Sequence, residues 1–523
     1  MKKMPAALHI CAFAVLFSAL LLSLTGCGRA EEEALTELWV VTEASKSDGM
    51  NLQAELVAES FEKAHPGITV ELEILPTDAQ ARETYLHQLR TQIMAGEGPD
   101  VYLLPTGGTL STGTPKSLKE IQVEPLFPDV RQSMCSGIFR DIREYYDGDA
   151  ALNTAALHPD IMDAGCLREE RYVLPLRFDT TVLMADGANW AASGLDASLL
   201  NGGLDTLTEA ILESDVTQMA AYGLQLPDDL TALPQVFDYE KGELLVNQQQ
   251  IADYMRLYQR WKAESVRQAQ PVNEKWEQYV EDSVEPSFLK FLGFSEVDHT
   301  CFNRINYYFN YKLHWISAGF PVFTESTEYI MDAALMANRL GQDAALYPLR
   351  DIDGLSHARI TYYGAVGSGC SQPELAYDFL RQFLTEEYQW DLYRPRVEKT
   401  SEPFDYEQDD PQCYILVESS WPVRVFGAVE HLWDNRDYQL FHYSGTQARI
   451  LALHADGILT EEDLSVLSGP LDAVDFPIVQ AEEETLSHAL SQLNDEKGQP
   501  ADADIDKLAQ QVYENLWWHL AEG

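Results

Sequence analysis

Residues 37–104 alternate short apolar runs with segments of helical period, and this alternation constrains the fold more than any other feature. Glu37–Thr42 is a compact apolar run that suits a buried strand, and Ile68–Leu75 alternates apolar and polar residues as a strand does. Between them, Leu52–Ala64 places apolar residues at helical spacing and ends at Pro66-Gly67. These residues predict a β-α-β unit.

A second helix is expected over Thr84–Ala95, followed by a buried strand over Asp100–Leu104. Repeated alternation predicts an α/β fold with a mostly parallel sheet, whose ligands bind at the C-terminal ends of the strands. Arg171–Met184 contains two strand-like runs that flank Arg177–Thr181. Further elements are expected as a strand over 359–366 and as helices over 204–214, 251–263, 372–385 and 504–520.

The segment Thr106–Thr114 is rich in glycine and hydroxyl side chains, which is typical of a loop. It lacks the glycine and lysine spacing of phosphate-binding loops. We therefore interpret it as a flexible connection and a candidate crossing point between lobes, and we expect no nucleotide site and no cofactor.

The N-terminus has the pattern of an export signal. Two lysines precede the apolar run Ile10–Leu24, which ends in Leu24-Thr25-Gly26-Cys27, a lipobox. A spanning helix needs about 20 apolar residues, and this run is shorter. We expect residues 1–26 to be a cleaved signal peptide, Cys27 to carry the lipid anchor with palmitate among its acyl chains, and residues 27–35 to form an acidic tether. The alternative is an uncleaved anchor helix, which a membrane-bound, unlipidated Cys27→Ser protein would favour.

The composition excludes one class of partner and predicts more than one core. The chain has 36 Lys and Arg against 84 Asp and Glu, a formal net charge of −48. Such a charge repels nucleic acid, so we exclude nucleic-acid binding, and it favours a soluble monomer. With 46% hydrophobic residues in 523, the chain exceeds what one core supports, and two lobes are expected.

The cysteines do not predict a metal site. After Cys11 and Cys27, five remain, without the Cys/His spacing of zinc sites. A Cys135–Cys166 disulfide is one possibility, and the pairing of Cys301, Cys370 and Cys413 is open. Asp502, Asp504 and Asp506 resemble the start of a calcium loop, but Lys507 and Tyr513 stand where glycine and a bidentate glutamate are required.

An ordered series of motifs resembles the extracellular solute-binding proteins of ABC importers, in particular those that bind maltodextrins and other oligosaccharides. The motifs are the opening strand followed by Phe61–Val70, Gln92–Val101, Arg171–Leu183, Gly369–Leu380 and the final helix Asp504–Leu520. Together they span most of the chain after Cys27.

The resemblance implies a two-lobed periplasmic-binding-protein fold, type II-like, with hinge-connected lobes that close around a ligand. Lobe 1 would comprise 36–112 plus 364–412, and lobe 2 would comprise 118–360 plus 415–523. The implied function is non-enzymatic capture of a small solute, an oligosaccharide, for ABC permease subunits. The protein would be lipid-anchored on the outer face of the bacterial plasma membrane, which is the periplasmic side where an outer membrane exists.

Candidate ligand-binding residues are polar or aromatic side chains near the ends of the predicted strands, because sugars stack on aromatic rings and bond to carboxylates. They are Thr42, Glu43, Tyr102, Asp179, Tyr363 and Trp421. Each has a structural alternative, since an aromatic residue in a strand is usually in the core and a carboxylate at a strand end is usually a cap.

Two other functions remain open. A surface-anchored glycan hydrolase would use two of the many carboxylates, but the chain contains no GxSxG or HExxH motif. A binding lipoprotein used for sensing or adhesion is the second alternative. Adjacent permease genes would favour uptake, and an adjacent sensor kinase would favour signalling.

Overall fold

The structure is a computed structural model of the whole chain. The residues described are 36–43, 50–112, 119–214, 223–282, 322–326, 344–385, 421–422, 469–481, 485–495 and 497–522. The predicted signal, lipobox and tether lie outside these residues, as do Cys301 and Cys413. Within them, no helix is long and apolar enough to cross a membrane.

The elements before the middle of the chain include the predicted β-α-β unit. They are β1 (Thr36–Glu43), α2 (Met50–Ala64), β2 (Ile68–Leu75), α3 (Ala79–Met94), β3 (Val101–Pro105), β4 (Thr109–Thr112), β5 (Lys119–Gln122), α4 (Val130–Cys135), α5 (Arg143–Gly148), α6 (Pro159–Asp163), β6 (Cys166–Leu167), β7 (Glu170–Arg171), β8 (Val173–Asp186), α7 (Gly187–Ser193) and α8 (Leu204–Glu213).

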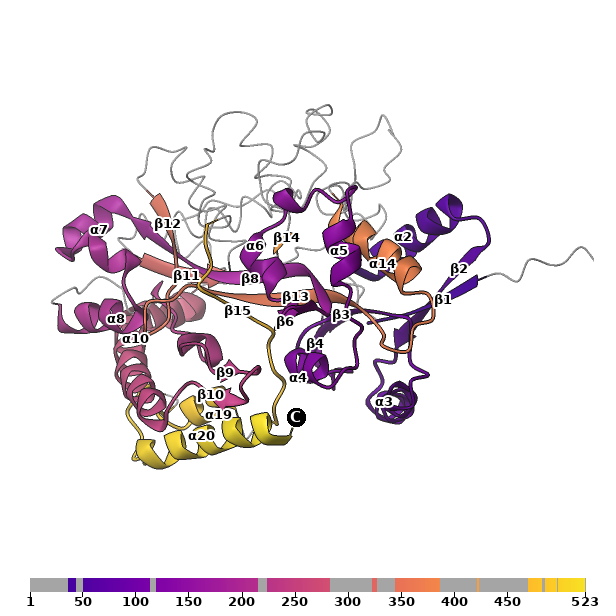
Figure 1. Cartoon of the computed structure of the whole chain (residues 1–523). Coiled ribbons are helices and arrows are strands. Elements are labelled where there is room, and N and C mark those ends of the chain that lie inside the picture. The colour runs from indigo at the N-terminus through magenta and orange to yellow at the C-terminus, as the bar shows by residue number, and fades with distance from the viewer. Residues whose placement is uncertain are drawn as a thin grey trace, which may run out of the picture.

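The later elements return the chain to the same sheet and end in a long helix (Figure 1). They are β9 (Phe237–Asp238), β10 (Glu243–Leu244), α10 (Gln248–Asp282), β11 (Val322–Ser326), β12 (Ala344–Pro348), β13 (His357–Val366), α14 (Pro373–Arg381), β14 (Trp421–Pro422), β15 (Ala473–Asp475), α19 (Leu486–Ser491) and α20 (Ile505–Glu522).

Most of these elements confirm the predictions from periodicity. One predicted start was wrong: α3 begins at Ala79 and not at Thr84, because the Asp78 side chain accepts a hydrogen bond from the Ala81 amide and caps the helix there. The predicted helix over 251–263 belongs to the much longer α10.

Nine strands of the described part of the chain form one sheet, with the order β11-β8-β13-β3-β1-β2 and with β12, β14 and β15 off this path. β1 pairs in parallel with β2 and β3, as predicted. The prediction of a mostly parallel sheet was wrong. Strand β13 is antiparallel to both β3 and β8, and β11, β12 and β14 are antiparallel to β8. These strands enter the sheet from distant parts of the sequence and not through successive β-α-β crossovers.

β8 is one continuous strand, where the sequence predicted two runs separated by Arg177–Thr181. Its pairing with β13 is interrupted near the middle, with register shifts between Ile360 and Tyr363. Pro175 of β8 lies opposite Tyr363 and has no N–H to donate, which explains an irregular ladder at this point. Thr361 is skipped in the pairing, and its carbonyl instead accepts a hydrogen bond from the Thr106 amide.

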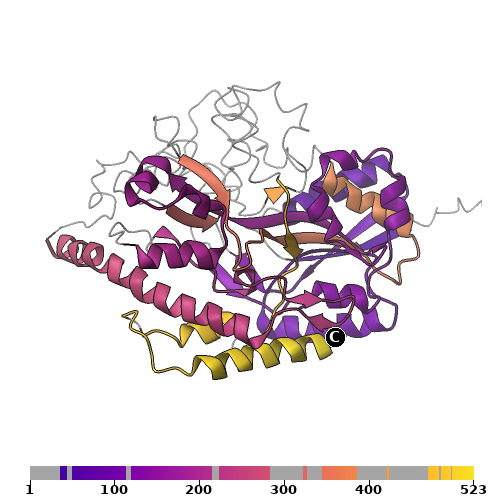
Figure 2. The ribbon, with the colours of Figure 1, turned by 60° about the vertical axis from the view of Figure 1, so that its left-hand side comes forward.

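The buried apolar residues form two clusters, and β8 passes from one to the other. The first core contains residues of β1, β3, α3, β13 and α14, and the second contains residues of α8, α10, α19 and α20. Phe178 of β8 belongs to the first core and Leu183 to the second. Figure 2 shows α10 and α20 side by side, away from the N-terminal strands. The predicted two-lobed α/β fold is thereby confirmed.

The exact lobe boundaries stay a prediction. The packing adds that apolar residues between Leu126 and Phe178 lie in the first core with the N-terminal strands, although the resemblance placed 118–360 in lobe 2.

Two other expectations differ from the structure. Thr109–Thr112, expected within a flexible connection, forms strand β4 and pairs with β5. Cys135 and Cys166 are free thiols, so the disulfide considered for them is not formed, and Cys370 is also free.

Candidate functional site

A small, open pocket with a cavity volume of about 10 Å³ lies where β8 and β13 run side by side between the two cores. Its walls come from β8, from the start of β13, from the turn before β13 and from the segment that follows α8. The lining residues are Asp179, Thr180, Thr181, Pro227, Thr231, Leu349, Arg350, His357 and Arg359. The location between cores is typical of small-molecule sites.

Arg359 connects three segments of the pocket wall. It lies opposite Asp179 in the β8–β13 ladder. Its Nη2 donates to Asp179 Oδ2 at 3.3 Å, and its Nη1 donates to Asp229 Oδ2 at 2.6 Å. Burial alone would lower the pKa of Arg359, but the two carboxylates outweigh it and raise the pKa above its ordinary value. The guanidinium is therefore a permanent, fixed cation in the wall.

The turn between β12 and β13 is fixed by the buried carboxylate of Asp351, which is 1% exposed. Its Oδ1 accepts hydrogen bonds from the amides of Asp353 and Leu355, both at 2.8 Å, and its Oδ2 lies 2.7 Å from His357 Nε2. Such bonds from an aspartate to the following amides stabilise tight turns. The turn thereby positions Arg350 and His357 at the pocket.

Arg350 has hydrogen-bonding capacity left in this wall. Its Nη1 donates to the Gly354 carbonyl at 2.7 Å and lies 3.4 Å from Asp472 Oδ2. That Asp472 oxygen already accepts shorter bonds from the amide and hydroxyl of Ser356, which together lower the pKa of Asp472. Among the described residues, the buried Arg350 Nε has no hydrogen-bond partner.

The pocket combines cationic N–H donors with a carboxylate and hydroxyl groups. Donors and acceptors of this kind in one wall suit a small solute with several hydroxyl groups, since each hydroxyl both donates and accepts. The charged groups of the wall pair with one another, so the pocket avoids the energetic cost of a buried charge without a partner.

Of the predicted ligand residues, Asp179 lines this pocket, and Thr42 and Glu43 lie elsewhere. Both are buried at the end of β1, with 2% and 5% exposure. Two nitrogens of Arg82 donate to the two carboxylate oxygens of Glu43. Burial raises the pKa of Glu43, and the Arg82 guanidinium opposes that shift.

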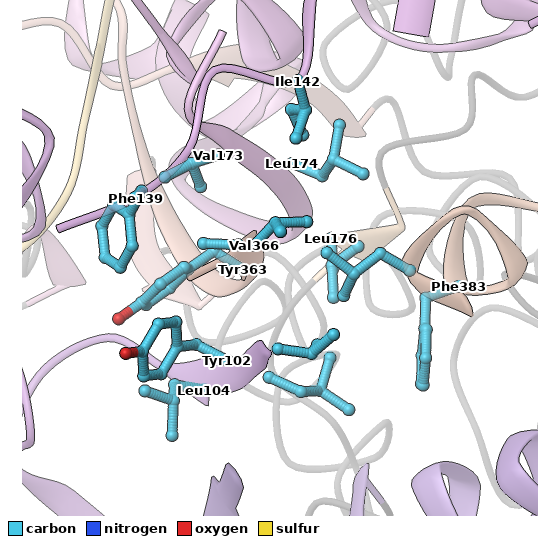
Figure 3. Close-up of a cluster of buried hydrophobic side chains, with 14 of the residues drawn as sticks. Tyr102, Leu104, Phe139, Ile142, Val173, Leu174, Leu176, Tyr363, Val366 and Phe383 are labelled. Atoms are coloured by element: carbon cyan, nitrogen blue, oxygen red, sulfur yellow. The ribbon is translucent and has the colours of Figure 1, made fainter. Parts of the chain in front are cut away.

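Tyr102 and Tyr363 are brought together, but in the first core and not at the pocket. Each is 1% exposed, and both pack edge-to-face against Phe139. Figure 3 shows their rings among apolar side chains, with the two hydroxyl oxygens on the same side. Burial raises the pKa of each hydroxyl. As ligand-binding residues, these two tyrosines and Thr42 and Glu43 stay predictions.

The structure describes only the backbone of Trp421, which pairs with Phe178 beside Asp179. Cys27 lies outside the described residues. The sequence interpretation missed Arg350, His357 and Arg359, because charged residues in turns and at the start of a strand usually face solvent. The one available signal was the opposite charge of Asp179, between the two strand-like runs, and Arg359, at the start of a predicted strand.

The sequence model of the family described as bacterial extracellular solute-binding protein matches residues 43–285. The match is to the family that the motifs resemble, and it confirms that resemblance over these residues. The matched part includes all of β8 and therefore the Asp179 side of the pocket. No curated protein matches the sequence.

Several solved structures are similar along most of their length. The family 1 extracellular solute-binding protein of Alicyclobacillus acidocaldarius is 13% identical, with TM-score 0.45 and coverage of 93% of this chain and 98% of that one. An oligogalacturonide-binding protein of Yersinia enterocolitica is 14% identical, with TM-score 0.45 and coverage of 93% and 99%. An ABC substrate-binding protein of Listeria monocytogenes in complex with cycloalternan is 13% identical, with TM-score 0.41 and coverage of 93% and 99%.

Proposed function

We propose that this chain is the substrate-binding protein of an ABC importer, and that it captures an oligosaccharide outside the plasma membrane without chemical turnover. The observation that carries the proposal is the family match over residues 43–285, which includes the β8 wall of a polar pocket between two cores. Closure of the two lobes around the solute would create the surface that the permease subunits bind.

Asp179 and Arg359 are the proposed solute contacts in the pocket, with Arg350 as a further donor. Thr42, Glu43, Tyr102, Tyr363 and Trp421 remain candidates for contacts in another arrangement of the lobes. The proposed lipid on Cys27 would keep the protein at the membrane, as a monomer near the importer.

A thermal-shift screen of the protein starting at Gly28 tests the proposal. The panel should contain mono- and oligosaccharides, amino acids, polyamines and short peptides, because a ligand that binds only the folded state raises the melting temperature. We expect a saturable shift with one class of oligosaccharide and no product in the mixture. Product formation would support a hydrolase, and a panel without any shift would count against solute capture.

Asp179→Asn and Arg359→Gln test the pocket. Each should weaken the solute-induced shift, whereas Arg256→Gln, which removes an exposed arginine paired with Asp253 and Asp506, should leave it unchanged. The lipid anchor has its own test: radiolabelled palmitate should enter the full chain and should not enter Cys27→Ser.

A further inference from the structure

The last turn of α20 reaches from the second core to the first. Val512 and Leu516 of α20 belong to the second core, whereas Val130 and Met134 of α4 belong to the first. Figure 1 shows the C-terminal end of α20 below α4. His519, one turn beyond the last of these core residues, lies at the junction.

A buried carboxylate receives the end of the helix. Asp129 is 3% exposed and precedes α4, where its Oδ1 accepts a hydrogen bond from the Gln132 amide at 3.0 Å. Its Oδ2 accepts a bond from the Tyr239 hydroxyl at 2.7 Å and lies 2.7 Å from His519 Nε2. The Gln132 side chain donates to the His519 carbonyl. The side chains of Tyr239 and His519, which are 280 residues apart in the sequence, thus converge on one oxygen of Asp129.

Tyr239 belongs to neither side alone, because its ring packs against both cores. Burial and the adjacent Asp129 carboxylate raise the pKa of its hydroxyl, so the hydroxyl keeps its proton and donates. A buried carboxylate that loses such donors is costly until water or another group replaces them. Separation of α20 from α4 therefore costs free energy, because the Asp129 carboxylate loses hydrogen-bond donors.

We propose that Asp129, Tyr239 and His519 form an interlobe clasp, a non-covalent link that holds the two cores in the relative position seen here and opens when they move apart. β8 and β13 join the cores through the covalent chain and cannot be released. The clasp can be released, and it is separate from the pocket residues. It therefore adjusts the balance between lobe arrangements without contacting the solute.

The test compares a Tyr239→Phe/His519→Leu protein with Tyr258→Phe, which removes a hydroxyl from α10 in the second core and leaves Asp129 its donors. His519→Gln provides a second control, because its side-chain amide can still donate to Asp129. Hydrogen exchange of the amides near His519 measures release of the helix end. Solution X-ray scattering of the purified proteins, without added solute, measures the separation of the cores.

In the double variant we expect exchange near His519 to be at least about tenfold faster, which corresponds to about 1.4 kcal/mol, together with a larger radius of gyration. Tyr258→Phe should match the parent in both measurements, and His519→Gln should lie near it. Faster exchange with an unchanged scattering curve would overturn the proposal, because the contacts would then secure only the helix end. Unchanged exchange would overturn it as well.

Discussion

Replacement of Arg82 by methionine should destabilise the first core by about 3–5 kcal/mol, because it removes the partner of a buried carboxylate. Arg82 is 2% exposed and Glu43 is 5% exposed. The arginine Nη1 lies 3.0 Å from Glu43 Oε2, and its Nη2 makes the second contact of a bidentate pair. The Arg82 side chain also donates to the carbonyls of Pro76 and Glu124, which would lose these bonds.

The magnitude follows from the distance between the charges. At 3.0 Å, with an effective dielectric constant of about 20, the attraction is about 5.5 kcal/mol. Desolvation of both groups cancels much of that gain in the intact pair, but in the variant Glu43 alone retains its desolvation cost. The Glu43→Gln/Arg82→Met double variant has no charge left in the site, so it should recover about 2 kcal/mol.

Urea unfolding of the four proteins of this cycle measures the coupling. The pH dependence provides an independent check. Burial raises the pKa of Glu43 in the folded state, so folding favours its protonated form and this contribution to stability grows as pH falls through the folded-state pKa. Without Arg82 the pKa of Glu43 should rise further, and the loss of stability of the Arg82→Met protein should become smaller at acidic pH. A loss below about 1 kcal/mol at neutral pH would refute the reasoning and would leave Glu43 available as a ligand group.

Three further predictions concern other buried groups. Gly165→Ala should cost about 1–3 kcal/mol in thermal or urea unfolding, because its Cβ would lie 2.0 Å from a carbonyl oxygen of β8, whereas Gly148→Ala, with nothing within 4 Å, should cost much less. Iodoacetamide at pH 8 should label the exposed Cys135 in the folded protein and should label Cys370 only after unfolding, because burial raises the pKa of the Cys370 thiol to about 12. Mass spectrometry identifies the labelled cysteines, and labelling of Cys370 in the folded protein would contradict this prediction. Burial lowers the pKa of His158 below its ordinary 6.5, so the free energy of unfolding should fall as pH drops below that value. If a His158→Gln protein loses stability with falling pH as steeply as the parent, this histidine is not responsible.

The strands and helices of the first core could be predicted because their signals are local. In β1, β2 and α2 the apolar residues recur with the period of the element, and each element packs against a neighbour close in sequence. The direction of β13 could not be predicted in this way. Its partners β3 and β8 are far from it in the chain, and periodicity carries no information on whether two distant strands run parallel or antiparallel.

The candidate site shows the same division. Asp179 could be predicted as a candidate because it stands between two apolar runs, but Arg359 is 180 residues away and is brought beside it only by the β8–β13 ladder. The sequence also left the environment of Tyr102 open. A tyrosine in a strand run suits a ring that stacks on a sugar and a ring in the core equally well, and only the packing around Phe139 and Phe127 shows that this one is in the core.

The passage of β8 through both cores has a mechanical consequence. One core can rotate relative to the other only if the β8–β13 ribbon twists or bends between them, and a regular ladder resists bending within its own plane. The ladder is already irregular between Ile360 and Tyr363, where a residue is unpaired and Pro175 removes a donor. These residues lie inside the first core, where Phe178, Ile360 and Tyr363 are buried. Rotation between the cores should therefore bend β8 beyond them, between Phe178 of the first core and Leu183 of the second.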